Sequence, residues 1–155
     1  MSGIREKLQS LNIQLPAVKP AIGNYVDVSV TGNHAFVSGK LPLKEDGALL
    51  YSGRLGREVS LEEGYEAAAL CAKHILACLE AALGDLDRVK RIVRLGGFVA
   101  AGDGFTDIPK VVNGASDLFV KVFEDAGRHA RAAVGVASLP LGAPVEIEAL
   151  IEIAP

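Results

Sequence analysis

The sequence is poor in cysteine and lacks any long apolar run. Its two cysteines, Cys71 and Cys78, lie seven positions apart in a helical pattern. That spacing is about 10 Å along a helix axis, which is too far for an intrahelical disulfide. Reduced thiols and the absence of a signal-peptide pattern lead us to expect a cytoplasmic protein. No apolar stretch approaches the length that spans a bilayer, so we expect no membrane partner.

Basic residues are not in surplus either. Lys and Arg total 16 against 19 Asp and Glu, a net charge of −3. The densest basic cluster lies within residues 88–94 and reads as the solvated side of a strand, so we do not expect nucleic acid as the main partner. The glycines at Gly102 and Gly104 lack the lysine and spacing of a phosphate-binding loop.

The composition that remains is typical of one globular domain. Half of the 155 residues are hydrophobic and 23% are charged. We expect a single domain over residues 1–155, with residues 1–19 as an N-terminal extension. Residues 4–14 read as a short helix or turn, and Pro16 and Pro20 follow it.

Alternating hydrophobicity predicts six strands. They cover residues 25–30, 34–39, 49–52, 89–99, 130–137 and 145–153. Gly32-Asn33 predicts a hairpin between the first two strands, and residues 139–144 form a turn between the last two. Gly96-Gly97 suggests a β-bulge within the strand 89–99.

Two helices are expected between the strands. Ser60 and Glu63 have capping-box spacing and begin an alanine-rich helix that ends at Leu83, with Gly84 as its left-handed cap. Pro109 suits the first turn of a second helix. The order βββαβαββ, with hairpins early and late, predicts an α+β fold with both helices on one face of a mixed sheet. The other face then needs cover, and another copy of the chain is one candidate.

Arg131 lies in a run of small and apolar residues on the strand 130–137. Its side of the strand carries Ala133 and Gly135, which leave space for a docking molecule. Removing water from a guanidinium costs several kcal/mol unless a partner replaces the lost hydrogen bonds. The guanidinium matches a carboxylate through two parallel donors, so Arg131 is a candidate anion ligand.

An ion pair with the last strand is the competing explanation. Glu146, Glu148 and Glu152 share one face of that strand. In a hairpin of the last two strands, Glu146 would lie on the order of 16 Å from Arg131. Glu152 could still pair diagonally with Arg131, so both explanations stay open.

Three residues of the first helix could in principle bind a metal. Cys71, His74 and Cys78 fall on one helical face but lack a fourth ligand and lie among apolar residues, so we interpret them as core and expect no metal. Elsewhere, His129 either borders Arg131 or is a solvated strand end.

Two motifs occur in order along the chain. The C-terminal motif consists of Ala130-Arg131-Ala132-Ala133-Val134, Leu139-Pro140 and Val145-Glu146-Ile147-Glu148-Ala149. The N-terminal motif consists of Ala21-Ile22-Gly23-Asn24-Tyr25 and Val37-Ser38-Gly39. Together they resemble the Rid (YjgF-type, reactive intermediate deaminase) family, over roughly residues 20–153.

The resemblance implies a chorismate-mutase-like homotrimer with sites between subunits. There Arg131 would bind the carboxylate of a 2-imino or enamine acid, and Glu146 would position the water that hydrolyses it to a 2-keto acid and ammonia. The resemblance also implies that Tyr25, Ser38, Gly39 and Asn113 bind the substrate. An imine is already electrophilic, so this reaction requires no metal or organic cofactor.

The chain departs from the family pattern at three places. Ala133 stands where many members have cysteine, Lys40 stands where glutamine is common, and residues 44–56 form a longer region. These differences indicate a divergent subgroup. A non-catalytic trimer that binds small carboxylates is therefore the alternative function. A ribonuclease activity is less consistent with the acidic composition and with the lack of a paired general-base histidine.

Overall fold

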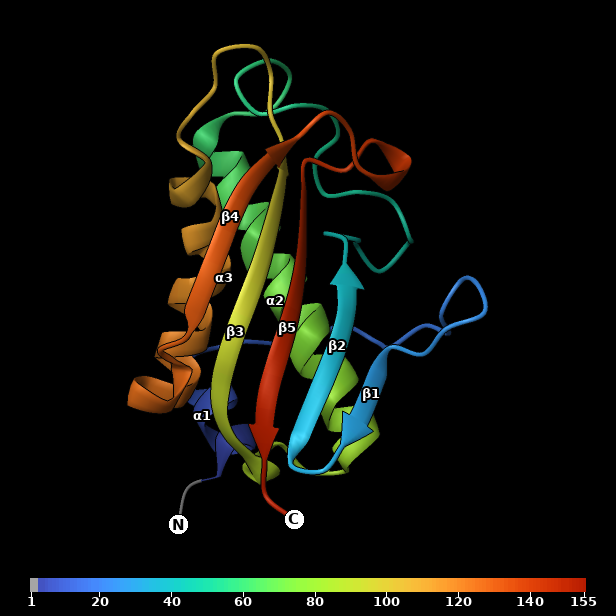
Figure 1. The fold of residues 1–155 in the computed structure, drawn as a ribbon, viewed down its shortest axis with the longest axis vertical. Helices are drawn as coiled ribbons and strands as arrows, with labels where there is room; N and C mark the ends of the chain where they lie inside the picture. Colours follow the sequence, from blue (N-terminus) through green and yellow to red (C-terminus); the bar gives the residue numbers. More distant parts are fainter. Residues whose placement is uncertain (1–2) are drawn as a thin grey trace.

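The computed structural model describes residues 3–155 as an α+β fold around one mixed five-stranded sheet (Figure 1). The strand order is β1-β2-β5-β3-β4; β4 runs parallel to β3, and the other neighbours pair antiparallel. The strands are β1 (Val28–Thr31), β2 (His34–Lys40), β3 (Val89–Ala100), β4 (Ala130–Val136) and β5 (Val145–Ile153).

Helices α2 (Leu61–Leu83) and α3 (Ile108–Phe123) cover one face of the sheet, as expected, and lie behind it in Figure 1. The short helix α1 (Ile4–Ser10) lies at the end of the molecule where both termini emerge. Three 3₁₀ segments complete the structure: η1 (Leu86–Arg88), η2 (Glu124–Gly127) and η3 (Pro140–Gly142). None of the helices in residues 3–155 is long and apolar enough to cross a membrane.

The predicted caps of α2 are confirmed. The backbone N–H of Glu63 donates to Ser60 Oγ at 3.2 Å, and the N–H of Ser60 donates to Glu63 Oε1 at 3.0 Å. Gly84 ends the helix with a φ of 81°, a left-handed conformation that glycine adopts without steric cost. The buried face of α2 is built mainly from small residues, which lets the helix lie close to both α3 and the sheet.

The strand predicted over residues 49–52 is wrong. Leu49 forms only an isolated bridge with Leu43, and the N–H of Leu50 bonds back to the carbonyl of Pro42. Gly53, with a φ of 116°, turns the chain away immediately afterwards. A four-residue segment is too short to fix its own partner, and these local turn contacts outweigh its β-propensity.

The late hairpin is also wrong, because β3 lies between β4 and β5. The succession β3-α3-β4 forms a parallel pair joined by a crossover helix, which places β4 at the sheet edge. The turn over residues 139–144 therefore carries the chain past β3 to reach β5. The separation calculated from a hairpin does not apply to Arg131 and Glu146.

The bulge predicted at Gly96-Gly97 is misplaced. The β3–β5 register is regular there, and its shifts lie between Val89 and Arg91 and between Ile92 and Arg94. The two glycines instead allow close contacts on both faces of β3. A Cβ on Gly96 would lie 2.7 Å from Glu148 Oε1, and one on Gly97 would lie 2.6 Å from the Val112 methyl groups.

Gly114 lies where α3 packs closely against the backbone of α2. A Cβ there would overlap the backbone carbonyl of Tyr65, which cannot move without displacing α2. We expect Gly114→Ala to lower the free energy of unfolding by about 1–3 kcal/mol or more, as measured by urea denaturation. The control is Gly64→Ala, whose nearest neighbour is the flexible end of Leu55. An equal loss in both variants would contradict the backbone clash.

The face of the sheet opposite the helices carries no helical cover in the described chain. We call it the open face. Alternation along β5 places Glu146, Glu148, Leu150 and Glu152 there and buries the residues between them, as the sequence predicts. Apolar side chains also lie on this face, and Phe36 and Val134 remain 48% and 45% exposed. Such a surface is suited to contact with another protein chain.

Candidate functional site

Helix α3 holds the half-buried guanidinium of Arg131. Nη1 of Arg131 donates to Asn113 Oδ1 at 2.7 Å and to Ser116 Oγ at 3.1 Å. Asn113 and Ser116 lie three residues apart on α3, so both face β4. The structure thus brings Asn113 to Arg131, although the two are 18 residues apart in sequence.

The opposite edge of this guanidinium has no protein partner among residues 3–155. Both hydrogen bonds use Nη1, which leaves Nε and Nη2, and no carboxylate lies within 4.0 Å. Glu152 pairs instead with Arg91 at 3.2 Å, so the Arg131–Glu152 ion pair considered from the sequence is wrong. The Nε–Nη2 edge carries two parallel N–H donors, the geometry that binds a carboxylate bidentately.

The strand surface beside Arg131 has only small residues. Ala133 and Gly135 share its side of β4, as alternation predicts. A Cβ on Gly135 would lie 2.9 Å from Ile108 Cδ1, so Ile108 covers the strand at that point. Between Arg131 and Ile108 the strand therefore presents a short, half-buried surface where a small molecule could rest against Ala133.

Glu146 and Gly39 form a second group, on the open face. The carboxylate of Glu146 lies directly over Gly39, where any Cβ would clash with it. Glu146 is half-buried; burial raises the pKa of its carboxyl, and the nearby charge of Glu148 raises it further. A carboxyl group with a raised pKa on a partly dry surface is suited to proton transfer.

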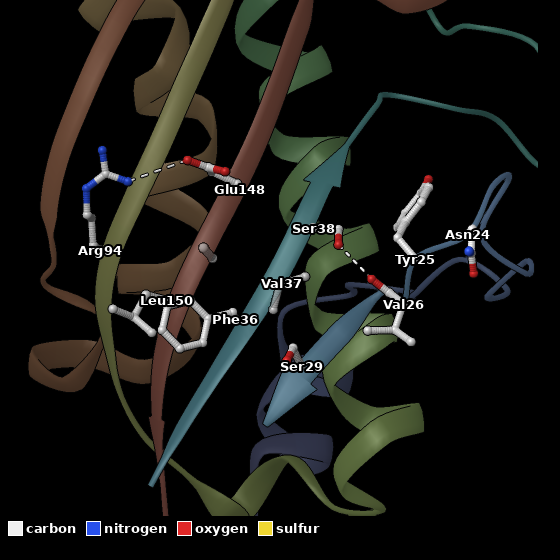
Figure 2. Close-up of a pocket in the computed structure, with 11 residues that line it drawn as sticks. Asn24, Tyr25, Val26, Ser29, Phe36, Val37, Ser38, Arg94, Glu148 and Leu150 are labelled. Carbon is white, nitrogen blue, oxygen red and sulfur yellow. Dashed lines mark hydrogen bonds and ion pairs between the residues drawn. The ribbon is translucent and has the colours of Figure 1, made fainter. Parts of the chain in front are cut away.

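Tyr25 and Ser38 line a neighbouring open hollow of about 780 Å³ (Figure 2). The Ser38 hydroxyl donates to the Val26 carbonyl at 2.7 Å and fixes the segment before β1 against β2. Tyr25 remains 54% exposed. Arg94 and Glu148 lie on the other side of the hollow and form an ion pair at 3.6 Å.

The predicted site residues therefore fall into two groups that one chain does not bring together. Arg131 and Asn113 lie on the helix side of β4, whereas Glu146 projects from the open face of β5. Two strand spacings separate β4 from β5, roughly 10 Å, and three residues along the strands add about 10 Å.

The sequence did not single out Ser116. Its only signal is the helical spacing of three residues from Asn113, which becomes informative once α3 is known to face Arg131. His129 does border the Arg131 group, because its Nε2 lies 2.8 Å from Ser116 Oγ.

His74 and Lys40, which the sequence singled out, each contact another part of the chain. His74 Nε2 lies 2.8 Å from the carbonyl oxygen of Leu43, and Cys71 is fully buried in the core, where burial raises the pKa of its thiol. Lys40 forms an ion pair with Asp27. The lysine at this position thus ties the segment before β1 to the end of β2.

Known proteins resemble this chain over nearly its whole length. Protein TCP17 of Trypanosoma cruzi is 48% identical over 151 residues, covering 97% of this chain and 94% of that protein. The crystal structure of Atu1372 from Agrobacterium tumefaciens, a protein of unknown function, matches with a TM-score of 0.88 and 45% identity, covering 97% and 91% of the two chains.

A second solved structure has the same fold. A "putative endoribonuclease" from Shewanella oneidensis MR-1 superposes with a TM-score of 0.94 and 34% identity, covering 98% of this chain and 100% of that one. Residues 5–152 match the family described as "YjgF/chorismate mutase-like, putative endoribonuclease". The fold, the two sequence motifs and the family match agree: the chain belongs to the YjgF/chorismate mutase-like family.

Proposed function

We propose that this protein hydrolyses 2-imino acids, and the enamines that tautomerise to them, to 2-keto acids and ammonia. The reaction takes place between subunits of a homotrimer, where Arg131 of one chain faces Glu146 of the next. The observation that carries the proposal is the free Nε–Nη2 edge of a guanidinium held only by the neutral oxygens of Asn113 and Ser116. The partner is then a small carboxylate-bearing metabolite rather than nucleic acid, and the location is the cytoplasm.

The imine carbon is already electrophilic, so the enzyme mainly has to orient the substrate and the attacking water. Arg131 binds the substrate carboxylate bidentately and fixes the adjacent imine carbon. Glu146 accepts a proton from the attacking water, whose oxygen bonds to that carbon. The nitrogen takes up the electron pair of the carbon–nitrogen double bond together with the proton that Glu146 had accepted. The remaining carbon–nitrogen single bond then breaks as the new hydroxyl group becomes the keto oxygen, and its proton also leaves with the nitrogen as ammonia. Tyr25, Ser38 and Gly39 line the open-face side of the cleft.

The raised pKa of Glu146 supports its role as base. Burial and the charge of Glu148 both make the carboxylate a stronger proton acceptor than an exposed glutamate. A base whose pKa lies nearer the working pH transfers protons more effectively. Because water and not the protein supplies the nucleophile, no covalent intermediate is required.

The division of the predicted site into two groups supports the proposed oligomer. An open face with Phe36 and Val134 about half exposed requires cover, and a second chain would supply the missing half of each site. We expect light scattering at micromolar concentration to give a mass of three times the 16.2 kDa chain. A stable monomer would contradict both the interface and the shared site.

The direct test is ammonia release from freshly generated 2-iminopropionate. We expect the wild type to accelerate release and Arg131→Ala not to. Arg128→Ala is the matched control, because Arg128 lies three residues before Arg131, is exposed and pairs only with Asp125. Pyruvate binding without any acceleration of ammonia release would favour the non-catalytic, carboxylate-binding trimer.

A further inference from the structure

We infer that Ser116 and His129 are positioning residues, which hold Arg131 so that its Nε–Nη2 edge is free to receive a substrate carboxylate. This inference rests on the proposed function and assigns two residues that support the substrate-binding arginine from behind. Neither residue touches the substrate in this arrangement. His129 acts on Ser116, and Ser116 acts on Arg131.

A continuous hydrogen-bonded chain runs from the η2 segment to Arg131. His129 Nδ1 lies 2.6 Å from the carbonyl oxygen of Gly127, and its Nε2 lies 2.8 Å from Ser116 Oγ. A carbonyl oxygen can only accept, so Nδ1 carries a proton. In a neutral ring Nε2 is then the acceptor, and the hydroxyl of Ser116 donates its single proton to it.

The direction of the hydrogen bond between Ser116 and His129 makes Ser116 Oγ an acceptor for Arg131. With its hydroxyl proton committed to His129, Ser116 Oγ presents a lone pair, and Arg131 Nη1 donates to it at 3.1 Å. Asn113 Oδ1 accepts from the same nitrogen at 2.7 Å. The two hydrogens of Nη1 thus have two acceptors, and the guanidinium cannot rotate without breaking one of these bonds.

The surroundings of His129 keep its ring in the required state. Burial lowers the pKa of His129, and the charge of Arg131 lowers it further, against the bond to the Gly127 carbonyl, which raises it. The ring is therefore mainly neutral at pH 7. Its ring contacts Ser116 and Phe119 of α3 and the carbonyl of Gly127 in η2, and Arg131 of β4 is the charged group that acts on its pKa.

The groups that hold Arg131 are uncharged, and this affects how strongly the guanidinium can bind an anionic ligand. A carboxylate in place of Ser116 or Asn113 would hold Arg131 equally well, but it would neutralise the guanidinium and compete with the substrate anion. Two neutral oxygens and a neutral histidine orient the guanidinium and leave its charge available. If His129 only linked η2 to α3, Ser116 would not need to be a neutral acceptor for Arg131.

Four variants test the inference: Ser116→Ala, Ser116→Thr, His129→Phe and His129→Gln. Ser116→Ala removes an acceptor from Nη1, and His129→Phe keeps an aromatic ring against Phe119 but removes both nitrogens. We expect both to raise KM for 2-iminopropionate and the Kd of pyruvate about tenfold, with a smaller change in kcat. Ser116→Thr keeps the hydroxyl and His129→Gln keeps an acceptor, so both should restore most of the affinity.

Nitrogen-15 NMR of the wild type shows directly which ring nitrogen of His129 carries the proton, so this second test needs no variant. We expect protonated Nδ1 and unprotonated Nε2 at pH 7, and the opposite tautomer would overturn the inference. Wild-type pyruvate affinity in both Ser116→Ala and His129→Phe would overturn it as well, while the proposed function would stand. Failure of the proposed function is seen differently, as an Arg131→Ala variant that binds pyruvate as tightly as the wild type.

Discussion

Arg131→Lys is expected to lose nearly as much deaminase activity as Arg131→Ala, with kcat/KM reduced by roughly two to three orders of magnitude in both. Lysine keeps the positive charge but offers a point donor in place of two parallel N–H groups. Its ammonium would also be drawn towards Asn113 and Ser116, the acceptors that now hold Nη1. The substrate carboxylate would then be held with less orientation.

Initial rates of ammonia release, corrected for the folded fraction, measure this effect. Arg128→Lys serves as the control, because its arginine is exposed and pairs only with Asp125. If Arg131→Lys retained most of the activity, the arginine would supply only positive potential, and the role of its free Nε–Nη2 edge would be contradicted.

Glu146→Gln is expected to lower turnover by roughly two to four orders of magnitude, the usual contribution of a positioned acid or base. Glutamine keeps the shape over Gly39 and some hydrogen bonding, but it cannot accept the proton of the attacking water. Turnover and melting temperature measured on the same preparation separate catalysis from folding. A large loss of stability with normal activity per folded trimer would contradict the catalytic role.

The pKa of Glu146 determines the direction of the accompanying change in stability. Because this pKa is raised in the folded state, the carboxyl group favours folding below its unfolded pKa. That contribution disappears as the pH rises through the folded pKa. Glu146→Gln should therefore be at least as stable as the wild type at pH 8, and any advantage should shrink as the pH falls.

The pH profile of turnover follows from the same carboxyl group. Activity should fall as the pH drops and Glu146 becomes protonated. Glu148→Gln should move the midpoint of this fall to lower pH, because Glu148 contributes to the raised pKa. An unchanged midpoint in Glu148→Gln would show that another group controls the profile.

Residues that act through near neighbours in sequence were predictable. Ser60 and Glu63 satisfy backbone donors within the same turn, so the start of α2 follows from their spacing. Alternation along β5 depends only on the pleat, and it correctly placed Glu146 and Glu148 on the face opposite the core. The two motifs around Tyr25 and Arg131 were likewise enough to indicate the family.

The sheet order and the surroundings of Arg131 were decided only by tertiary structure. Which strands pair depends on the packing of whole layers, so β3, not β5, lies next to β4, and the residues 49–52 form no strand. Asn113, Ser116 and His129 meet Arg131 because α3 crosses from β3 to β4, a contact that no local pattern encodes. The strand pattern of residues 130–137 was enough to show that the Arg131 guanidinium lies among small residues. The tertiary structure decided which edge of it is held by neutral oxygens and which edge is free, because hydrogen-bond partners distant in sequence are specified only by the packed fold.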